Sequence, residues 1–181
     1  MSFPPASRSR ARIAIVSDTH MPKGERRIPA RALELMAASE TTVHAGDIST
    51  LRILRELEEL GPPVHAVHGN VDEPALVDLL PAERRFFCFG KVIVVVHDAG
   101  PARGRIERLR ARYPEADAVV FGHSHIPLHE RAGKFQIFNP GSPTERRRAP
   151  QRSLGLLSLE AGELRFEHVW LGVSQPAVAS G

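Results

Sequence analysis

Cysteine and long apolar runs are both scarce in this sequence of 181 residues, whose one cysteine is Cys88. One cysteine cannot form an intrachain disulfide, which suits a reducing compartment. Because Cys88 lies in the apolar run 86–89, we expect it to be a small buried hydrophobic residue. No stretch approaches the length of about 18 apolar residues that a transmembrane helix needs, and no apolar signal segment precedes the first predicted strand. We therefore expect a cytoplasmic protein without a membrane partner.

The net charge is also small. The chain has 24 lysine and arginine residues and 21 aspartate and glutamate residues, which gives a net charge of +3. All but three of the basic residues are arginines, and they form no concentrated basic stripe. Long nucleic acid is therefore not favoured as a partner. A steep loss of DNA or RNA affinity with salt would reverse that interpretation.

The composition, with 42% hydrophobic and 25% charged residues, is that of an ordinary globular protein. A chain of this length buries roughly 68–70% of its unfolded surface in one core, so we predict a single domain over residues 12–173. Residues 1–11 and 174–181 are predicted to be tails.

Strand-like and helix-like segments alternate in the first part of the chain, and hairpins dominate after residue 126. The pattern predicts helices over 30–38, 51–58, 74–80 and 103–113, the second of them capped by Ser49 or Thr50. It predicts strands over 13–16, 42–45, 64–67, 86–89, 92–96, 118–121, 126–131, 135–138, 153–159 and 164–171. Alternation followed by hairpins indicates an α/β (α+β) protein with two packed sheets and helices outside. The apolar hairpins at 153–171 either close the core or form an interface between copies of the chain.

Potential metal ligands follow nearly every predicted strand of the first 125 residues. They are Asp18, His20, Asp47, Asn70, His97, His123 and His125. Because the carboxyl ends of strands line one crevice in an open α/β sheet, these side chains should meet there. In an extended segment residues i and i+2 face the same side, which would direct Asp18 with His20 and His123 with His125 to the site while Thr19 and Ser124 point away. The neighbouring Gly46, Gly69 and Gly122 permit close approach of the backbone.

Carboxylate, imidazole and amide oxygen without thiolate form a ligand set for Mn, Fe, Ni, Co or Zn. Seven ligands are too many for one tetrahedral ion and suit two ions about 3.5–4 Å apart. A carboxylate can bridge two cations, and we predict that Asp47, in the central loop, is that bridge. Such a site should attract a phosphate oxygen and activate a bound water, so that hydroxide bridging the ions attacks phosphorus in line.

The ordered motifs Asp18-X-His20, Gly46-Asp47, Gly69-Asn70-X-Asp72, His97 and Gly122-His123-X-His125 resemble the calcineurin-like metallophosphoesterase superfamily. The short chain, the Gly-His-Ser-His-Ile-Pro run and Asn139-Pro140-Gly141-Ser142 are similar to its small bacterial and archaeal phosphodiesterase branch. The resemblance covers about residues 12–171. It implies a four-layer α-β-β-α sandwich with a binuclear site. It also implies that Asp18, His20, Asp47 and His125 hold one ion and that Asp47, Asn70, His97 and His123 hold the other.

Two positions depart from the family pattern. Many phosphatases of the superfamily carry a histidine directly after the motif asparagine to protonate the leaving group, where this sequence has Val71, so no general acid is identified. Asp98 follows His97 where the family commonly has glycine, and this extra carboxylate either lowers the positive charge of the site or forms a hydrogen bond beside it. Arg103 or Arg105, which follow His97 closely, is the candidate substrate-binding residue, and Arg103 is our choice.

The sequence therefore predicts a metal-dependent phosphodiesterase acting on a small phosphate ester, with two divalent ions, most simply manganese. Two alternatives stay open. One is a phosphomonoesterase or nucleotide phosphodiesterase. The other is a non-catalytic interaction scaffold of the same fold, like the retromer sorting subunit, which has lost ligand residues. The seven filled ligand positions favour an enzyme.

Overall fold

The computed structural model describes residues 12–24 and 26–172. The predicted tails, 1–11 and 174–181, lie outside the described residues, as does the predicted domain end at residue 173. Within the described ranges, each predicted helix and strand is present, with its ends shifted by a few residues. No helix in these ranges is long and apolar enough to cross a membrane.

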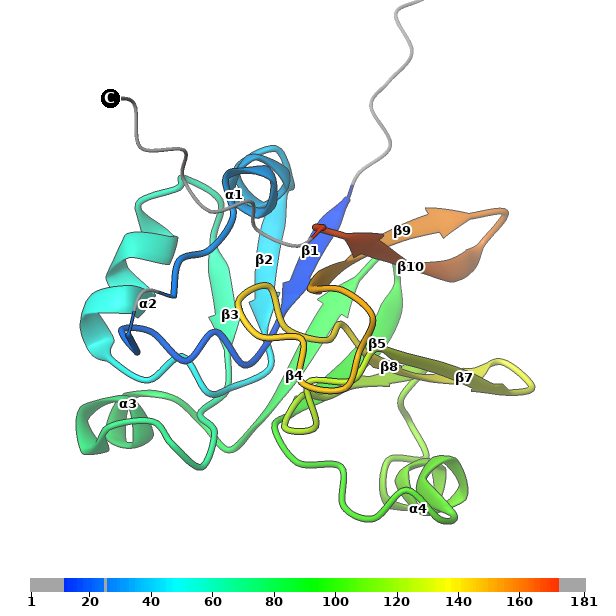
Figure 1. Ribbon diagram of the computed structural model, residues 1–181. Coiled ribbons are helices and arrows are strands. Elements are labelled where there is room, and N and C mark those ends of the chain that lie inside the picture. Colours follow the sequence, from blue (N-terminus) through cyan, green and yellow to red (C-terminus); the bar gives the residue numbers. More distant parts are fainter. Residues whose placement is uncertain (1–11, 25, 173–181) are drawn as a thin grey trace, which may run out of the picture.

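The strands form two five-stranded mixed sheets (Figure 1). The first sheet has the order β10-β9-β1-β2-β3 and the second β4-β5-β6-β8-β7. In the first sheet β1, β2 and β3 are parallel, and in the second β5, β6 and β8 are parallel, while the hairpins add antiparallel strands. The strand bounds are β1 Ile13–Val16, β2 Thr41–His44, β3 Val64–Ala66, β4 Glu83–Cys88, β5 Lys91–Val96, β6 Ala118–Val120, β7 Leu128–Ala132, β8 Phe135–Asn139, β9 Ser153–Glu160 and β10 Glu163–Trp170.

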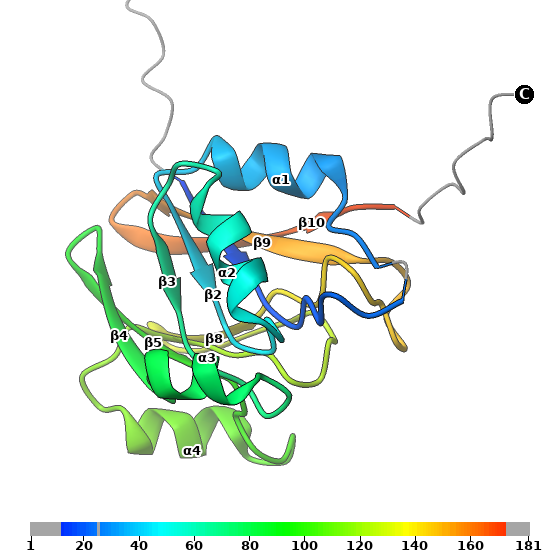
Figure 2. The ribbon, with the colours of Figure 1, turned by 90° about the vertical axis from the view of Figure 1, so that its left-hand side faces the viewer.

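Helices cover the outer faces of the two sheets. Figures 1 and 2 show α1 (Ala30–Ala37) and α2 (Leu51–Glu58) over the first sheet, and α4 (Arg105–Arg112) on the far side of the second. The short α3 (Pro74–Leu79) lies in the connection from the first sheet to the second. The four-layer α-β-β-α sandwich is therefore confirmed.

The wholly apolar strand β1 shows why the layers form in this way. Ile13 and Ile15 pack in the cluster between the two sheets, whereas Ala14 and Val16 pack in the cluster beneath α1 and α2. Successive side chains of a strand point to opposite faces, so a strand covered on both sides needs apolar residues throughout. The hairpin of β9 and β10 buries Leu157, Leu164 and Phe166 in the same inter-sheet cluster, so these residues close the core of the chain.

Three local expectations were only partly right. Thr50 is the N-cap residue of α2, but its hydroxyl makes no capping bond; instead the Leu51 amide donates to the Glu73 carboxylate over 2.7 Å. α4 begins only at Arg105 because Gly104 has a left-handed φ of 62°. Cys88 is half-buried rather than buried, because it lies on the edge strand β4, and burial raises the pKa of its thiol to about 12.

Candidate metal centre

All seven predicted ligands lie together where strands of both sheets end. Asp18 and His20 follow β1, Asp47 follows β2, and Asn70 follows β3 in the first sheet. The second sheet contributes His97 after β5, and His123 and His125 after β6. Among the described residues, two groups place their ligand atoms within 4.8 Å of one another: Asp18, His20, His125, and Asp47, His97, His123.

The first group is almost completely buried. The Nε2 atoms of His20 and His125 are 3.0 Å apart, and Oδ1 of Asp18 lies 3.3 Å from Nε2 of His125 and 3.9 Å from that of His20. Two imidazole nitrogens and a carboxylate oxygen thus converge on one point. A divalent cation there would satisfy all three atoms at once, so the donor set fits a borderline-soft transition metal.

The second group is more open to solvent, because His123 is exposed. Nε2 of His97 lies 3.2 Å from Oδ2 of Asp47 and 3.1 Å from Oδ1 of Asn70. That same amide oxygen lies 2.9 Å from Nδ1 of His123. Asn70 is therefore within reach of the same point as the other three side chains.

Asp47 faces both groups with one oxygen. Its Oδ2 lies 3.4 Å from Nε2 of His20 in the first group and 3.2 Å from Nε2 of His97 in the second. Its other oxygen, Oδ1, accepts a hydrogen bond from the Val71 amide at 3.0 Å. This backbone hydrogen bond holds the carboxylate between the two groups.

The backbone brings Asp18 with His20, and His123 with His125, to the site by a route different from the predicted one. These four residues and Asp47 all have left-handed φ, between 46° and 67°, so the segments are tightly turned rather than extended. Left-handed conformations of non-glycine residues cluster at functional sites, where surrounding contacts hold them. The intervening side chains do point away as predicted: the Thr19 hydroxyl bonds to the Asp47 carbonyl, and Ser124 accepts from the Asn139 side chain.

The three glycines beside the ligands allow the backbone to pass close to them. A Cβ at Gly69 would overlap the Asp47 carboxylate. A Cβ at Gly122 would lie 2.7 Å from Oδ2 of Asp18, and one at Gly46 2.6 Å from Nδ1 of His97. Any larger residue would have to displace a predicted ligand.

The 140–149 loop packs against the first group, which the sequence reasoning did not foresee. The Ser142 hydroxyl donates to the Asp18 carbonyl at 2.8 Å, and the Thr144 hydroxyl to the Thr19 carbonyl at 2.8 Å. Oε2 of Glu145 lies 3.3 Å from Nδ1 of His125, although this buried nitrogen has no aligned hydrogen-bond partner among the described residues. The Asn139-Pro140-Gly141-Ser142 run was the available signal, but by itself it assigned no contact.

Burial and neighbouring charges set the protonation of the ligands. Burial raises the pKa of Asp18 to about 7, although the hydroxyl of Ser17 bonds to it at 2.6 Å. Burial would also raise the pKa of Asp47, but hydrogen bonds from His97 and the Val71 amide prevail and lower it to about 2. Burial, with the charge of Arg147, lowers the pKa of His125 to about 3. Asp47 and His125 are thus held in the deprotonated forms that bind metal.

Beside the centre, the wholly buried His44 should make stability pH-dependent. Burial lowers its pKa to about 3, and its Nε2 lies 3.3 Å from the Thr19 hydroxyl. Because the unfolded chain binds a proton at His44 below its ordinary pKa of 6.5, the free energy of unfolding should fall as pH falls from there, by up to about 1.4 kcal/mol per pH unit. In His44→Gln, the free energy of unfolding should therefore depend less steeply on pH. The measurement is urea unfolding of chelator-treated protein at a series of pH values. An unchanged slope would contradict the assignment, because the other titrating groups are common to both proteins.

A groove of about 410 Å³ opens beside the second group. Its walls combine predicted ligands with the apolar Ala82 and Val96 and the charged Glu83, Asp98 and Arg112. The Asp98 carboxylate is engaged by its own loop, because its Oδ1 accepts a hydrogen bond from the Gly100 amide at 2.7 Å. Val71 is 46% exposed at the rim of the site.

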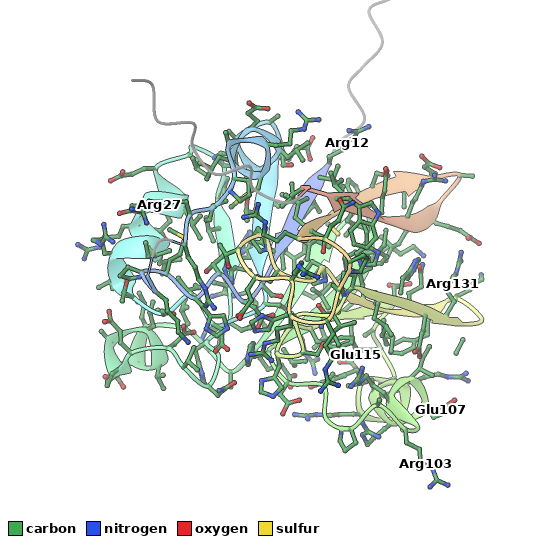
Figure 3. All side chains as sticks on the ribbon, in the orientation of Figure 1. Arg12, Arg27, Arg103, Glu107, Glu115 and Arg131 are labelled. Atoms are coloured by element: carbon green, nitrogen blue, oxygen red, sulfur yellow. The ribbon has the colours of Figure 1, made fainter. Side chains whose placement is uncertain are left out.

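The structure does not bring Arg103 to the centre. Figure 3 shows its side chain pointing into solvent beyond α4, away from the body of the protein. Proximity to His97 in sequence was misleading because the 98–104 loop leads outward to α4. Arg105 is also occupied, since its guanidinium donates to the Gly100 carbonyl and lies 5.0 Å from the Phe121 ring.

Residues 12–162 match the sequence model of the calcineurin-like phosphoesterase superfamily domain. A probable metallophosphoesterase of Methanothermobacter thermautotrophicus is 34% identical over 134 residues, which are 73% of this chain and 77% of the relative. Phosphodiesterase YfcE of Escherichia coli is 28% identical, with 81% of this chain and 86% of the relative covered. Among solved structures, Vps29 of Entamoeba histolytica complexed with zinc shares the fold, with a TM-score of 0.70 at 22% identity over 88% of this chain and 98% of that one.

Proposed function

Because this chain belongs to the calcineurin-like phosphoesterase superfamily, we propose that it is a metal-dependent phosphodiesterase with a binuclear centre. It is a phosphoesterase by family, and relatives that carry the name phosphodiesterase support the finer assignment. The observation that carries the proposal is the position of Asp47, whose Oδ2 faces both ligand groups, at 3.4 Å and 3.2 Å from their nearest imidazole nitrogens.

The proposed ligands divide between two ions. Asp18, His20, Asp47 and His125 hold one, and Asp47, Asn70, His97 and His123 hold the other. When bound, the ions supply an activated water and positive charge for the phosphoryl oxygens. We propose manganese, because the oxygen- and imidazole-rich set without thiolate suits it; nickel, iron, zinc and cobalt have the same ligand preferences in part. The single cysteine supports a cytoplasmic location.

The chain's own residues shape the reaction in two ways. Asp47 stays ionised, fixed by the Val71 amide, and His125 stays neutral, so neither has to lose a proton when a cation arrives. At the rim, Val71 offers no proton to a leaving group. The preferred substrates are therefore esters whose leaving oxygen departs readily as an anion, and the groove beside His123 has room for one ester group.

The test is hydrolysis of bis(p-nitrophenyl) phosphate and p-nitrophenyl phosphate by chelator-treated protein before and after Mn, Ni or Zn is returned. We expect no turnover without metal and preferential turnover of the diester once metal is restored. Preference for the monoester would overturn the diesterase assignment while keeping the metal site. No turnover with about two ions bound per chain would favour the non-catalytic scaffold, a role suggested by the shared fold with Vps29.

A further inference from the structure

Arg147 lies at the edge of the proposed centre on the 140–149 loop. Its Nη1 donates to the carbonyl oxygen of His123 at 3.4 Å, and its side chain is 47% exposed. Its φ of 44° is left-handed, like those of the neighbouring ligand residues. The guanidinium is thus next to a predicted ligand and still open to solvent.

The charge of Arg147 is poorly neutralised. Its carboxylate neighbour is Glu145, whose Oε2 lies 4.0 Å from Nε of Arg147. Glu145 is already engaged by Arg26, at 2.9 Å, and lies 3.3 Å from His125. One carboxylate is therefore shared among three groups, and Arg147 is the most distant of them.

Other arginines near the centre are bound elsewhere. Arg108 donates to the carbonyls of Ala99 and Pro101, and Arg112 to the carboxylate of Glu83. Arg108 thus ties α4 to the loop that precedes it, and Arg112 ties α4 to β4. Arg112 also lines the groove but is paired with Glu83, whereas the contact of Arg147 beside the ligands is with the backbone carbonyl of His123.

We propose that Arg147 binds the non-bridging oxygens of the substrate phosphate, an inference that rests on the proposed phosphoesterase function. A guanidinium presents parallel N–H donors that match two oxygens of a phosphate, and its charge strengthens those bonds. Arg147 therefore takes the role that the sequence suggested for Arg103. Any phosphate ester or inorganic phosphate should use the contact.

The test compares Arg147→Ala, Arg147→Lys and the matched control Arg148→Ala, an exposed neighbour. In Arg147→Ala we expect kcat/KM for bis(p-nitrophenyl) phosphate to fall roughly 10- to 100-fold, the effect of losing a charged hydrogen bond. The Kd for inorganic phosphate, measured by calorimetry on manganese-loaded protein, should rise by a similar factor. Arg147→Lys should be intermediate, and Arg148→Ala should match the wild type, with metal content equal in all four proteins.

Equal phosphate affinity in Arg147→Ala and Arg148→Ala would overturn the inference, as would a loss of metal content in Arg147→Ala alone. Failure of the proposed function is a separate result, seen as no diester turnover in the wild type. In that case the phosphate titration still decides the role of Arg147, and a wild type without phosphate affinity would overturn it.

Discussion

Asp47→Asn is expected to lose bound metal and diester turnover together. Asparagine keeps the shape of the side chain but replaces one carboxylate oxygen with an amide nitrogen and removes the negative charge. In the native protein the pKa of Asp47 is lowered to about 2, so its full charge is present at neutral pH. Because its Oδ2 faces both ligand groups, the loss should weaken both ions rather than one.

The size of the effect follows from the role of a direct ligand. Removing a side chain that merely orients a ligand costs 10- to 100-fold in affinity or activity, so loss of a shared ligand should exceed roughly 100-fold. The measurements are metal content by mass spectrometry after equilibration with manganese, and turnover of bis(p-nitrophenyl) phosphate. Asp78→Asn, the same change at an exposed position on α3, is the control. Wild-type activity in Asp47→Asn would eliminate the bridge assignment.

Val71→His is expected to extend hydrolysis to esters with poor leaving groups. Val71 directly follows Asn70, its amide bonds to Asp47, and its side chain is exposed at the rim of the site. A histidine there would place a proton donor beside the ester oxygen. A positioned general acid contributes typically 10²–10⁴-fold, so we expect an increase of roughly 100-fold for alkyl phosphate esters. The p-nitrophenyl esters should change little, because p-nitrophenolate leaves without protonation.

The measurement is kcat/KM for an alkyl ester and a p-nitrophenyl ester side by side. Val71→Asn, which is polar but donates no acidic proton, is the matched control. Equal acceleration of both esters, or the same gain in Val71→Asn, would show that proton donation is not what Val71 lacks.

Sequence patterns predicted the secondary structure and the meeting of the seven ligands because both depend on strand order and burial. The apolar β1 and the polar residues at strand ends are properties of short segments. The reasoning from an extended Asp18-Thr19-His20 segment was wrong about the backbone, because left-handed turns held by contacts with the 140–149 loop cannot be read from three residues.

The prediction that Arg103 binds the substrate was wrong for the same reason. Arg103 is close to His97 in sequence, but the outward course of the 98–104 loop takes it into solvent. Arg147 reaches the site because Ser142 and Thr144 tie its loop to the Asp18-Thr19 backbone. Such contacts join segments more than a hundred residues apart, and no local spacing announces them. The cap that Glu73 provides for α2 was missed for a related reason, because Glu73 lies 22 residues from Leu51 in sequence.

Each of the two ligand groups draws on both sheets. Asp18 and His20 come from the first sheet and His125 from the second, while Asp47 comes from the first and His97 and His123 from the second. An ion held by either group would therefore act as a cross-link over the seam of the sandwich. Metal affinity and the docking of the two sheets are then thermodynamically linked. A substitution in the inter-sheet core, far from any ligand, can on this account be detected as a change in metal affinity.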